Sequence, residues 1–563
     1  MMNNLEDGIY KSITKKELIK IFCVGSLIGA IVFLACYGWK ILDVTNDSWL
    51  LTGQDISQHY IGWKFYRASA WHFPIGQIDG IIYPETSCII FSDSIPLFAI
   101  FFKILSPILP ETFQYFGIWG IASYILIGGI SAVIVRKSTK SCWLCWIGSG
   151  IFCLSPYVFQ RMYGHTALAG HWIILLAIGI WIYKPFFSTF RRKLAAWTGL
   201  LILGSLVHIY FIPMIMVFMF GFCLQDLFEK RGWKEDLVFA PVTVAADLIV
   251  LYAVGAFSKS GGYSDSGLGV YSANLNSLFN PNNYARYLKT LPIRPGQDEG
   301  FGYLGLGIIL LLGCALGIYI VYKVRNRRDI KQYLAKETKR MQIAFGCSMA
   351  VVLFVFFILA WSPEIVFGTK TVMRIHYPEF ILKILSTFRA SGRFIWCVGY
   401  LIMTFCMMAV CYYGKRAVAM ICMFGALLVQ IADMQNMILI KKNNVCQEKS
   451  LQTIQSAEWE KLAKGKNHLV ILPFSTVWQN QGILAAYEMG NFAVDHGMTI
   501  NYFPLARTDL EQIALNDAEY MAGAVDGVSR DETMYILDTE EKGRNLGLDV
   551  YYVDGYYIGI AEN

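Results

Sequence analysis

The feature that most constrains this chain is the recurrence of apolar runs, each about 20 residues long, up to about residue 440. A helix of about 20 apolar residues is long enough to cross the hydrocarbon core of a bilayer. Hydrophobic residues make up 55% of the chain and charged residues only 16%, whereas soluble proteins carry about a quarter charged residues. The sequence therefore predicts an α-helical polytopic membrane protein.

Basic residues cluster between the apolar runs, and such clusters mark the loops that face the cytoplasm. With each cluster inside, about eleven transmembrane helices are expected, at residues 19–38, 114–135, 142–160, 166–184, 194–208, 210–227, 237–256, 301–322, 341–361, 393–413 and 417–438. The N-terminus is then cytoplasmic, and the first run is a retained signal-anchor because no small-residue cleavage pattern follows it. The net charge of +7 reports this topology and not nucleic-acid binding.

One apolar run, Ile95 to Leu109, does not fit this alternation. If it crossed the membrane, the basic residues Arg136 and Lys137 would leave on the outer side. The run is also short, and Pro96 and Pro107 bound it. It is therefore predicted to be an interfacial or re-entrant helix under the first outer loop.

The first outer loop, residues 39–113, carries an acid and an imidazole four residues apart, Asp55 and His59. Side chains at this spacing share one face of a helix. At a membrane surface such a pair suits proton transfer on a lipid-linked substrate, and Asp93 is a second acid in the same loop. The alternative is a solvated loop in which Asp55 only caps a helix.

Histidines mark the outer face as the side where chemistry is expected. Interfacial packing alone would distribute histidines over both faces. On the predicted map all eight lie outside, at positions 59, 72, 165, 171, 208, 376, 468 and 496.

Cationic residues in the later outer loops suit the binding of a phosphate. Arg389 and Arg393 flank Ala-Ser-Gly at a helix start, where bidentate hydrogen bonds and the helix dipole favour an anion. Arg161, His165 and His171 lie near another helix end. The alternatives are snorkelling of the arginines to the interface and interfacial packing of the two histidines. His208 and His376 are expected to be structural.

Residues 441–563 change to a mixed, charged composition. Strands are predicted at 469–472 and 533–537, helices at 483–494 and 510–522, and a hairpin with its turn at Asp554-Gly555. About 120 residues suffice for a small domain, here a soluble extracytoplasmic α/β domain. Its sequence has no nucleotide loop, nucleophile elbow or paired metal ligands, which favours an accessory or acceptor-recognition role.

Five stretches together carry a resemblance to the GT-C glycosyltransferases, and in particular to a bacterial family of predicted members without an assigned acceptor. They are Thr-Gly-Gln-Asp55-Ile-Ser-Gln-His59-Tyr-Ile-Gly-Trp63, Trp71-His-Phe-Pro-Ile-Gly76, Ser92-Asp93-Ser-Ile-Pro96, Pro110-Glu-Thr-Phe-Gln-Tyr-Phe-Gly117 and Phe388-Arg-Ala-Ser-Gly-Arg-Phe394. The resemblance implies a GT-C-like transmembrane domain over residues 1–440. It also implies a polyprenyl-phosphate-linked sugar as donor and Asp55 as base or acceptor-positioning residue.

The resemblance further implies transfer of the sugar to an extracytoplasmic glycan, polymer or lipid at the bacterial plasma membrane. Many GT-C members have adjacent paired acids in the first outer loop, whereas here Asp55 stands alone and Asp93 is distant. No set of metal ligands is therefore carried over from the GT-C enzymes, and the binding of a divalent metal is left as an alternative. No redox cofactor is required. The alternative function is a transporter or flippase for a lipid-linked glycan, which would need ionisable residues at mid-bilayer. Asp247 is the one acid predicted near the middle of a span.

Overall fold

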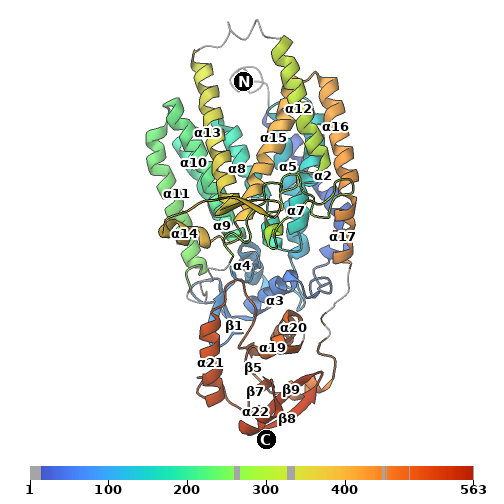
Figure 1. Ribbon diagram of the computed structural model, residues 1–563. Coiled ribbons are helices and arrows are strands. Elements are labelled where there is room, and N and C mark those ends of the chain that lie inside the picture. The colour runs from blue at the N-terminus through green and yellow to red at the C-terminus, as the bar shows by residue number, and fades with distance from the viewer. Residues whose placement is uncertain are drawn as a thin grey trace.

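The protein is a mostly helical membrane protein with a small sheet at one end (Figure 1). Its computed structural model describes residues 14–258, 267–325, 336–446, 451, 453–480 and 482–561. Within these ranges, eight helices are long and apolar enough to cross a membrane. They are α2 (Lys15–Tyr37), α5 (Phe116–Arg136), α10 (Phe211–Glu229), α11 (Trp233–Val254), α12 (Leu306–Arg325), α13 (Lys336–Trp361), α15 (Ile395–Tyr413) with the preceding turn η7 (Ser391–Phe394), and α16 (Arg416–Asp433).

The other three predicted spans also contain helix, but each departs from a regular span. The segment predicted at 142–160 is divided into α6 (Cys142–Cys153) and α7 (Pro156–Arg161), because Pro156 has no N–H to continue the helix. The segment predicted at 166–184 forms the turn η4 (Thr166–Ala169) and the short helix α8 (Trp172–Ile182). The third, α9 (Phe190–Val207), carries three consecutive basic residues, Arg191 to Lys193, in its first turn. The number of eleven spans stays a prediction.

Two glycines let the first helix pack directly against α5. A Cβ added at Gly25 would lie 2.5 Å from the carbonyl oxygen of Gly128, and one at Gly29 would lie 2.0 Å from that of Tyr124. Small residues four apart are typical of close helix contacts in membranes. This contact holds α2 against α5, the two helices that the first loop (residues 39–113) connects.

The first loop folds into short elements that cannot cross a membrane. It contains η2 (Lys40–Leu42), α3 (Asp55–Ala68), the antiparallel hairpin β1 (Gln77–Ile82) and β2 (Glu85–Cys88), α4 (Pro96–Ile104) and η3 (Ser106–Ile108). The run predicted to be interfacial or re-entrant thus forms α4 and η3. Nine residues of α-helix extend about 14 Å, less than half the bilayer core.

Further short elements connect the long helices. They are η5 (Lys184–Phe187), η6 (Gln297–Gly300), the hairpin β3 (Glu364–Phe367) and β4 (Lys370–Arg374), α14 (Glu379–Ser386) and α17 (Gln435–Val445). The turn η6 and the segment around η7 lie close to the site described below.

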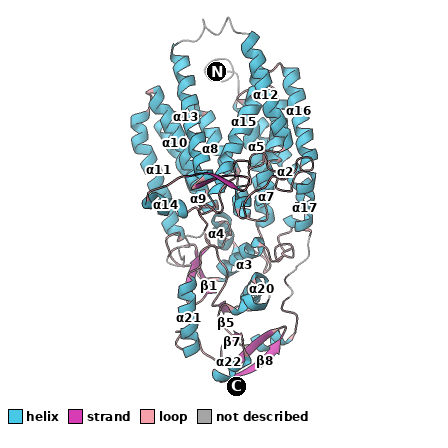
Figure 2. Ribbon diagram, viewed as in Figure 1, coloured by secondary structure: helices cyan, strands magenta, loops and turns pink. Residues whose placement is uncertain are grey.

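The C-terminal region forms a five-stranded mixed sheet, and Figure 2 shows most strands gathered at this end of the molecule. The strand order is β6-β5-β7-β9-β8, with β5 parallel to β6 and β7, and β9 antiparallel to β7 and β8. The strands are β5 (His468–Leu472), β6 (Thr499–Ile500), β7 (Thr533–Leu537), β8 (Leu548–Val553) and β9 (Tyr556–Ala561), and the helices are α18 (Glu458–Ala463), α19 (Thr476–Asn480), α20 (Ile483–Asp495), α21 (Leu510–Ala522) and α22 (Glu540–Asn545).

The predicted strands, helices and hairpin turn of this region are all present. Asp554 and Gly555 both have positive φ, 49° and 87°, as a two-residue hairpin turn of type I′ requires.

The C-terminal region docks onto the first outer loop through backbone and side-chain contacts. The Tyr83 amide donates to the Ile500 carbonyl at 2.8 Å, and the Tyr520 hydroxyl donates to the Tyr83 carbonyl at 2.7 Å. The Ala506 amide donates to the Phe91 carbonyl at 2.9 Å. These contacts bring the loop at 504–507 over the membrane portion, where it becomes one wall of a pocket.

Candidate functional site

A pocket of about 330 Å³ opens where the first outer loop, the ends of the long helices and the C-terminal region meet. Residues from each of these three parts line it. They include Asp55, Gln58, Phe91, Asp93 and Pro96 from the first loop, His165, Ser205, His208, Tyr210, Thr387, Arg389 and Arg393 from the helical part, and Ile483, Tyr487, Leu505, Ala506 and Arg507 from the C-terminal region.

Asp55 is the first residue of α3, so its carboxylate lies at the positive end of a helix dipole. Its Oδ2 is 3.4 Å from Nδ1 of His165, and nearly half of the side chain is exposed to the pocket. Asp55 therefore can meet a substrate hydroxyl while His165 holds its orientation.

His59 lies one turn further along α3 but points into the protein, where it is fully buried. Neither of its ring nitrogens has a hydrogen-bond partner among the described residues. Burial lowers its pKa to about 4, against the opposing pull of Asp93, so the ring is neutral at pH 7. The sequence placed Asp55 and His59 on one helix face, and the structure separates them into an exposed acid and a buried imidazole.

Asp93 sits in the turn before α4 with a φ of 54°, a left-handed conformation that aspartate tolerates better than most residues. Its Oδ1 is 3.3 Å from Nε2 of His208, and its Oδ2 is 4.0 Å from Nε2 of His59. Burial alone would raise the pKa of Asp93, but the imidazoles around it, His208 first, lower that pKa below its ordinary value. Asp93 is therefore an anion, and His208, expected to be structural, contacts a residue of the site.

Glu299, in η6, is a central residue that the sequence analysis missed. Its carboxylate accepts hydrogen bonds from Arg161 at 3.2 Å and from Arg393 at 3.0 Å, and it lies 3.5 Å from Nε2 of His165. Arg161 also stacks on the ring of Trp396, 5.2 Å from its centroid. The only sequence signal was that a guanidinium near the membrane needs an acidic partner, and no spacing in the chain points to position 299.

The structure divides the predicted phosphate-binding residues into two groups. Arg389, Arg393 and His165 line the pocket, and Arg389 is exposed there with no ion pair to another described residue. Arg161 lies behind Glu299 and does not line the pocket. His171 is fully buried, with Nδ1 3.0 Å from the Tyr400 hydroxyl, and it does not line the pocket either.

Arg507, from the C-terminal region, is a second arginine that the sequence analysis did not select. It lines the pocket and donates to the Thr387 carbonyl at 3.4 Å, two residues from Arg389 along the chain. The pocket is therefore lined by arginines from both the helical part and the C-terminal region.

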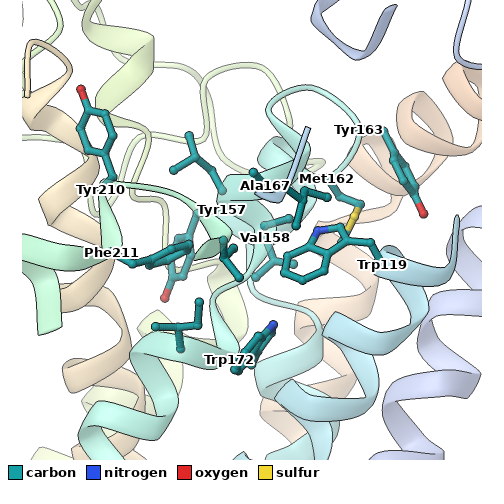
Figure 3. Close-up of a cluster of buried hydrophobic side chains, with 14 of the residues drawn as sticks. Trp119, Tyr157, Val158, Met162, Tyr163, Ala167, Trp172, Tyr210 and Phe211 are labelled. Atoms are coloured by element: carbon teal, nitrogen blue, oxygen red, sulfur yellow. The ribbon is translucent and has the colours of Figure 1, made fainter. Parts of the chain in front are cut away.

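The segment that carries Arg161 and His165 is anchored by a buried apolar cluster (Figure 3). Val158, Met162 and Ala167 are 0 to 1% exposed. The Trp119 indole packs beside Trp172, with ring centroids 6.4 Å apart, and its N–H donates to the Thr166 carbonyl at 2.9 Å. This packing keeps His165 at a defined distance from Asp55, because its backbone cannot shift without opening the core.

Three side chains at or directly beside the pocket have the composition of a cation site: Asp93 and His165 line it, and His59 is buried next to them. One ligand atom each from His59, Asp93 and His165 lies within 4.8 Å of the other two. This is the one such group of three or more histidine, cysteine or acidic residues in the described part of the chain.

Comparison with known protein families gives two matches. The family described as a domain of unknown function (DUF6311) matches residues 26–435, more than half of the chain. The DUF6311 C-terminal domain matches residues 458–561, which contain the mixed sheet. No curated protein matches the chain.

Proposed function

The chain belongs to the DUF6311 family, and from its pocket we propose that it is a membrane glycosyltransferase of the GT-C type. It transfers a sugar from a polyprenyl-phosphate-linked donor to an extracytoplasmic glycan, polymer or lipid acceptor. The observation that carries the proposal is the pocket itself, in which the accessible carboxylate Asp55 and the guanidinium groups of Arg389 and Arg507 line one cavity. General-base transfer from a lipid phosphate needs these two kinds of group and no redox cofactor.

In the proposed reaction Asp55 accepts the proton of the acceptor hydroxyl. The acceptor oxygen forms a bond to the anomeric carbon of the sugar as the bond from that carbon to the phosphate oxygen breaks. The electron pair of the broken bond leaves with the polyprenyl phosphate. Arg389 and Arg507 would stabilise the charge on that phosphate by bidentate hydrogen bonds. His165, 3.4 Å from Asp55, positions the base.

The proposed topology places this pocket at the outer surface of the bacterial plasma membrane. About eleven spans, a cytoplasmic N-terminus and an extracytoplasmic C-terminal region would follow from the distribution of basic loops. The lipid-linked donor would then enter from the bilayer, and the wall formed by Tyr487 and Ala506 would contact the acceptor.

The test compares two acids of the first outer loop. In a strain that lacks the gene, complementation with Asp55→Asn should fail to restore the surface glycan seen with the wild-type chain, because losing a general base costs about 10²–10⁴ in rate. Asp79→Asn is the matched control, since Asp79 pairs with His72 at 2.8 Å outside the pocket. Mass analysis of the surface glycans and the amount of protein in the membrane are the two readouts.

A fully active Asp55→Asn chain would remove Asp55 from the mechanism. Loss of activity in both variants, with normal protein levels, would mean that the loop and not the base was disturbed.

The second candidate function is a transporter or flippase for a lipid-linked glycan, and one observation favours it. Asp247, in the middle of α11, is 2% exposed and accepts a hydrogen bond at 2.7 Å from Ser205, which lines the pocket. Buried acids within spans often belong to ion or substrate paths. If Asp247→Asn abolished function while Asp55→Asn did not, transport would replace transfer as the conclusion.

A further inference from the structure

Directly behind Asp93, which lines the pocket, lies an imidazole without hydrogen-bond partners among the described residues. His59 is fully buried, and both of its nitrogens lack a hydrogen-bond partner among the residues that the structure describes. Leaving a buried polar group unpaired costs about 1–3 kcal/mol. Its nearest ionic neighbour, Oδ2 of Asp93, is 4.0 Å from Nε2, too far for a hydrogen bond.

We propose that His59, Asp93 and His165 bind a divalent metal ion of the zinc type at the side of this pocket that Asp93 and His165 line. The three ligand atoms lie within 4.8 Å of one another. Ligand atoms of a tetrahedral zinc ion, with bonds of about 2.0–2.1 Å, are about 3.3 Å apart. The most distant pair of ligand atoms needs to close by at most about 1.5 Å around the ion, and the ion gives His59 the partner that it lacks.

The residues around the three ligands are arranged as supporting groups. Metal-bound imidazoles and carboxylates are usually oriented by hydrogen bonds from their other polar atoms. His208 holds Oδ1 of Asp93 at 3.3 Å, which leaves Oδ2 directed toward His59. Whichever ring nitrogen of His165 binds the metal, the other faces a carboxylate, Asp55 at 3.4 Å from Nδ1 or Glu299 at 3.5 Å from Nε2.

The ligand types decide which ions the site would accept. Two imidazoles and one carboxylate suit zinc and its neighbours among the transition metals. Magnesium and calcium prefer all-oxygen sites. Three protein ligands would leave at least one position open toward the pocket, where a substrate oxygen could bind. That last role rests on the proposed function, whereas the binding of the ion does not.

The experiment measures metal binding without turnover. The full chain, purified in detergent and treated with EDTA, is dialysed against Zn²⁺ in excess Mg²⁺, and bound zinc is determined by elemental analysis and by competition with a chromophoric chelator. About one zinc ion per chain is expected for the wild type, and the melting temperature should rise when zinc is added.

The variants His59→Gln and Asp93→Asn should each weaken zinc binding by at least about 10-fold. His72→Gln is the matched control, because His72 pairs with Asp79 in the same loop but does not line the pocket. Its zinc affinity should equal that of the wild type. The visible spectrum of bound Co²⁺ in the wild-type chain gives a readout that does not depend on whether a variant folds.

Any of three results would refute the proposed metal site. The first is that the wild type binds no stoichiometric zinc, the second is that excess Mg²⁺ abolishes its zinc binding, and the third is that His59→Gln and Asp93→Asn bind zinc with the same affinity as the wild type. Failure of the metal site is separable from failure of the proposed transfer. If the wild type binds zinc but Asp55→Asn is fully active, the metal site is retained and the proposed transfer is rejected. If activity requires Asp55 but the wild type binds no zinc, the proposed transfer is retained and the metal site is rejected.

Discussion

Replacing Glu299 with glutamine should destabilise the protein far more than removing a comparable carboxylate at the surface. Glu299 contacts two guanidinium groups, with Nη2 of Arg161 at 3.0 Å and Nη2 of Arg393 at 2.9 Å. The side chains of these arginines are only 4% and 11% exposed. Glutamine keeps the shape but leaves two buried positive charges without a counter-ion. Breaking a buried ion pair in this way costs about 3–5 kcal/mol.

Glu364→Gln is the matched control for this substitution. Glu364 pairs with Arg294 at 3.0 Å, but both side chains are about a third exposed, and such pairs contribute about 0–1 kcal/mol. Thermal unfolding of both variants in the same detergent should show Glu299→Gln melting lower by roughly 5 °C. The control should stay within about 1 °C of the wild type.

The difference in melting temperature between Glu299→Gln and its control should not depend on pH above the acidic range. Burial alone would raise the pKa of Glu299, but Arg161 and Arg393 hold that pKa well below its ordinary value. A depressed carboxylate pKa gives stability that is present above the unfolded pKa, about 4.3, and is lost only as the pH falls further. The deficit of Glu299→Gln should therefore be constant between pH 6 and pH 8. Equal melting temperatures for the two variants would refute the view that this carboxylate neutralises the two arginines.

Three further predictions concern the pocket, the topology and the C-terminal region. Arg389→Lys should reduce the amount of surface glycan, because a point charge loses the bidentate geometry. The control Arg374→Lys, outside the pocket, should leave the amount of glycan unchanged. If Arg389→Lys were as active as the wild type, only snorkelling to the membrane interface would explain Arg389. Cysteines introduced at positions 450 and 326, neither of which is among the described residues, should react from opposite sides of the membrane. Position 450 should react from the extracytoplasmic side and position 326 from the cytoplasmic side. Labelling of both from the same side would reject the eleven-span map. Burial raises the pKa of Asp517 to about 6, above its unfolded value of about 3.9. At neutral pH the ionised carboxylate therefore lowers the free energy of unfolding by about 2–3 kcal/mol, and this penalty disappears as the pH falls toward 4. Asp517→Asn should raise the melting temperature at pH 7.5 and much less at pH 4.5, and a gain independent of pH would contradict this assignment.

Local patterns in the sequence were sufficient to predict most of the secondary structure. Helix α21 (Leu510–Ala522) and strand β7 (Thr533–Leu537) have the predicted bounds, and the hairpin turns at Asp554-Gly555. Each depends on a periodicity or a turn preference set by residues that are neighbours along the chain. The predicted span at 142–160 was wrong as a continuous helix, because Pro156 interrupts it.

Part of the pocket lining could be predicted from residue types and hydropathy alone. Asp55, Asp93, His165, Arg389 and Arg393 were predicted from loops expected to face outward, and they line one pocket, whereas the predicted residues His59, Arg161 and His171 do not. Hydropathy carries this information because the membrane sorts the loops to one face or the other before they pack.

The pairing of these residues follows from the packing of the whole molecule. Glu299 neutralises Arg161 and Arg393, which are 138 and 94 residues away in the chain. The contacts of His208 with Asp93 and of Arg507 with the Thr387 carbonyl likewise join distant segments. A buried charge requires a partner, and residue type alone shows that requirement. Which partner meets it depends on distances of a few ångströms, and these are set by how the helices, the first loop and the C-terminal sheet pack together.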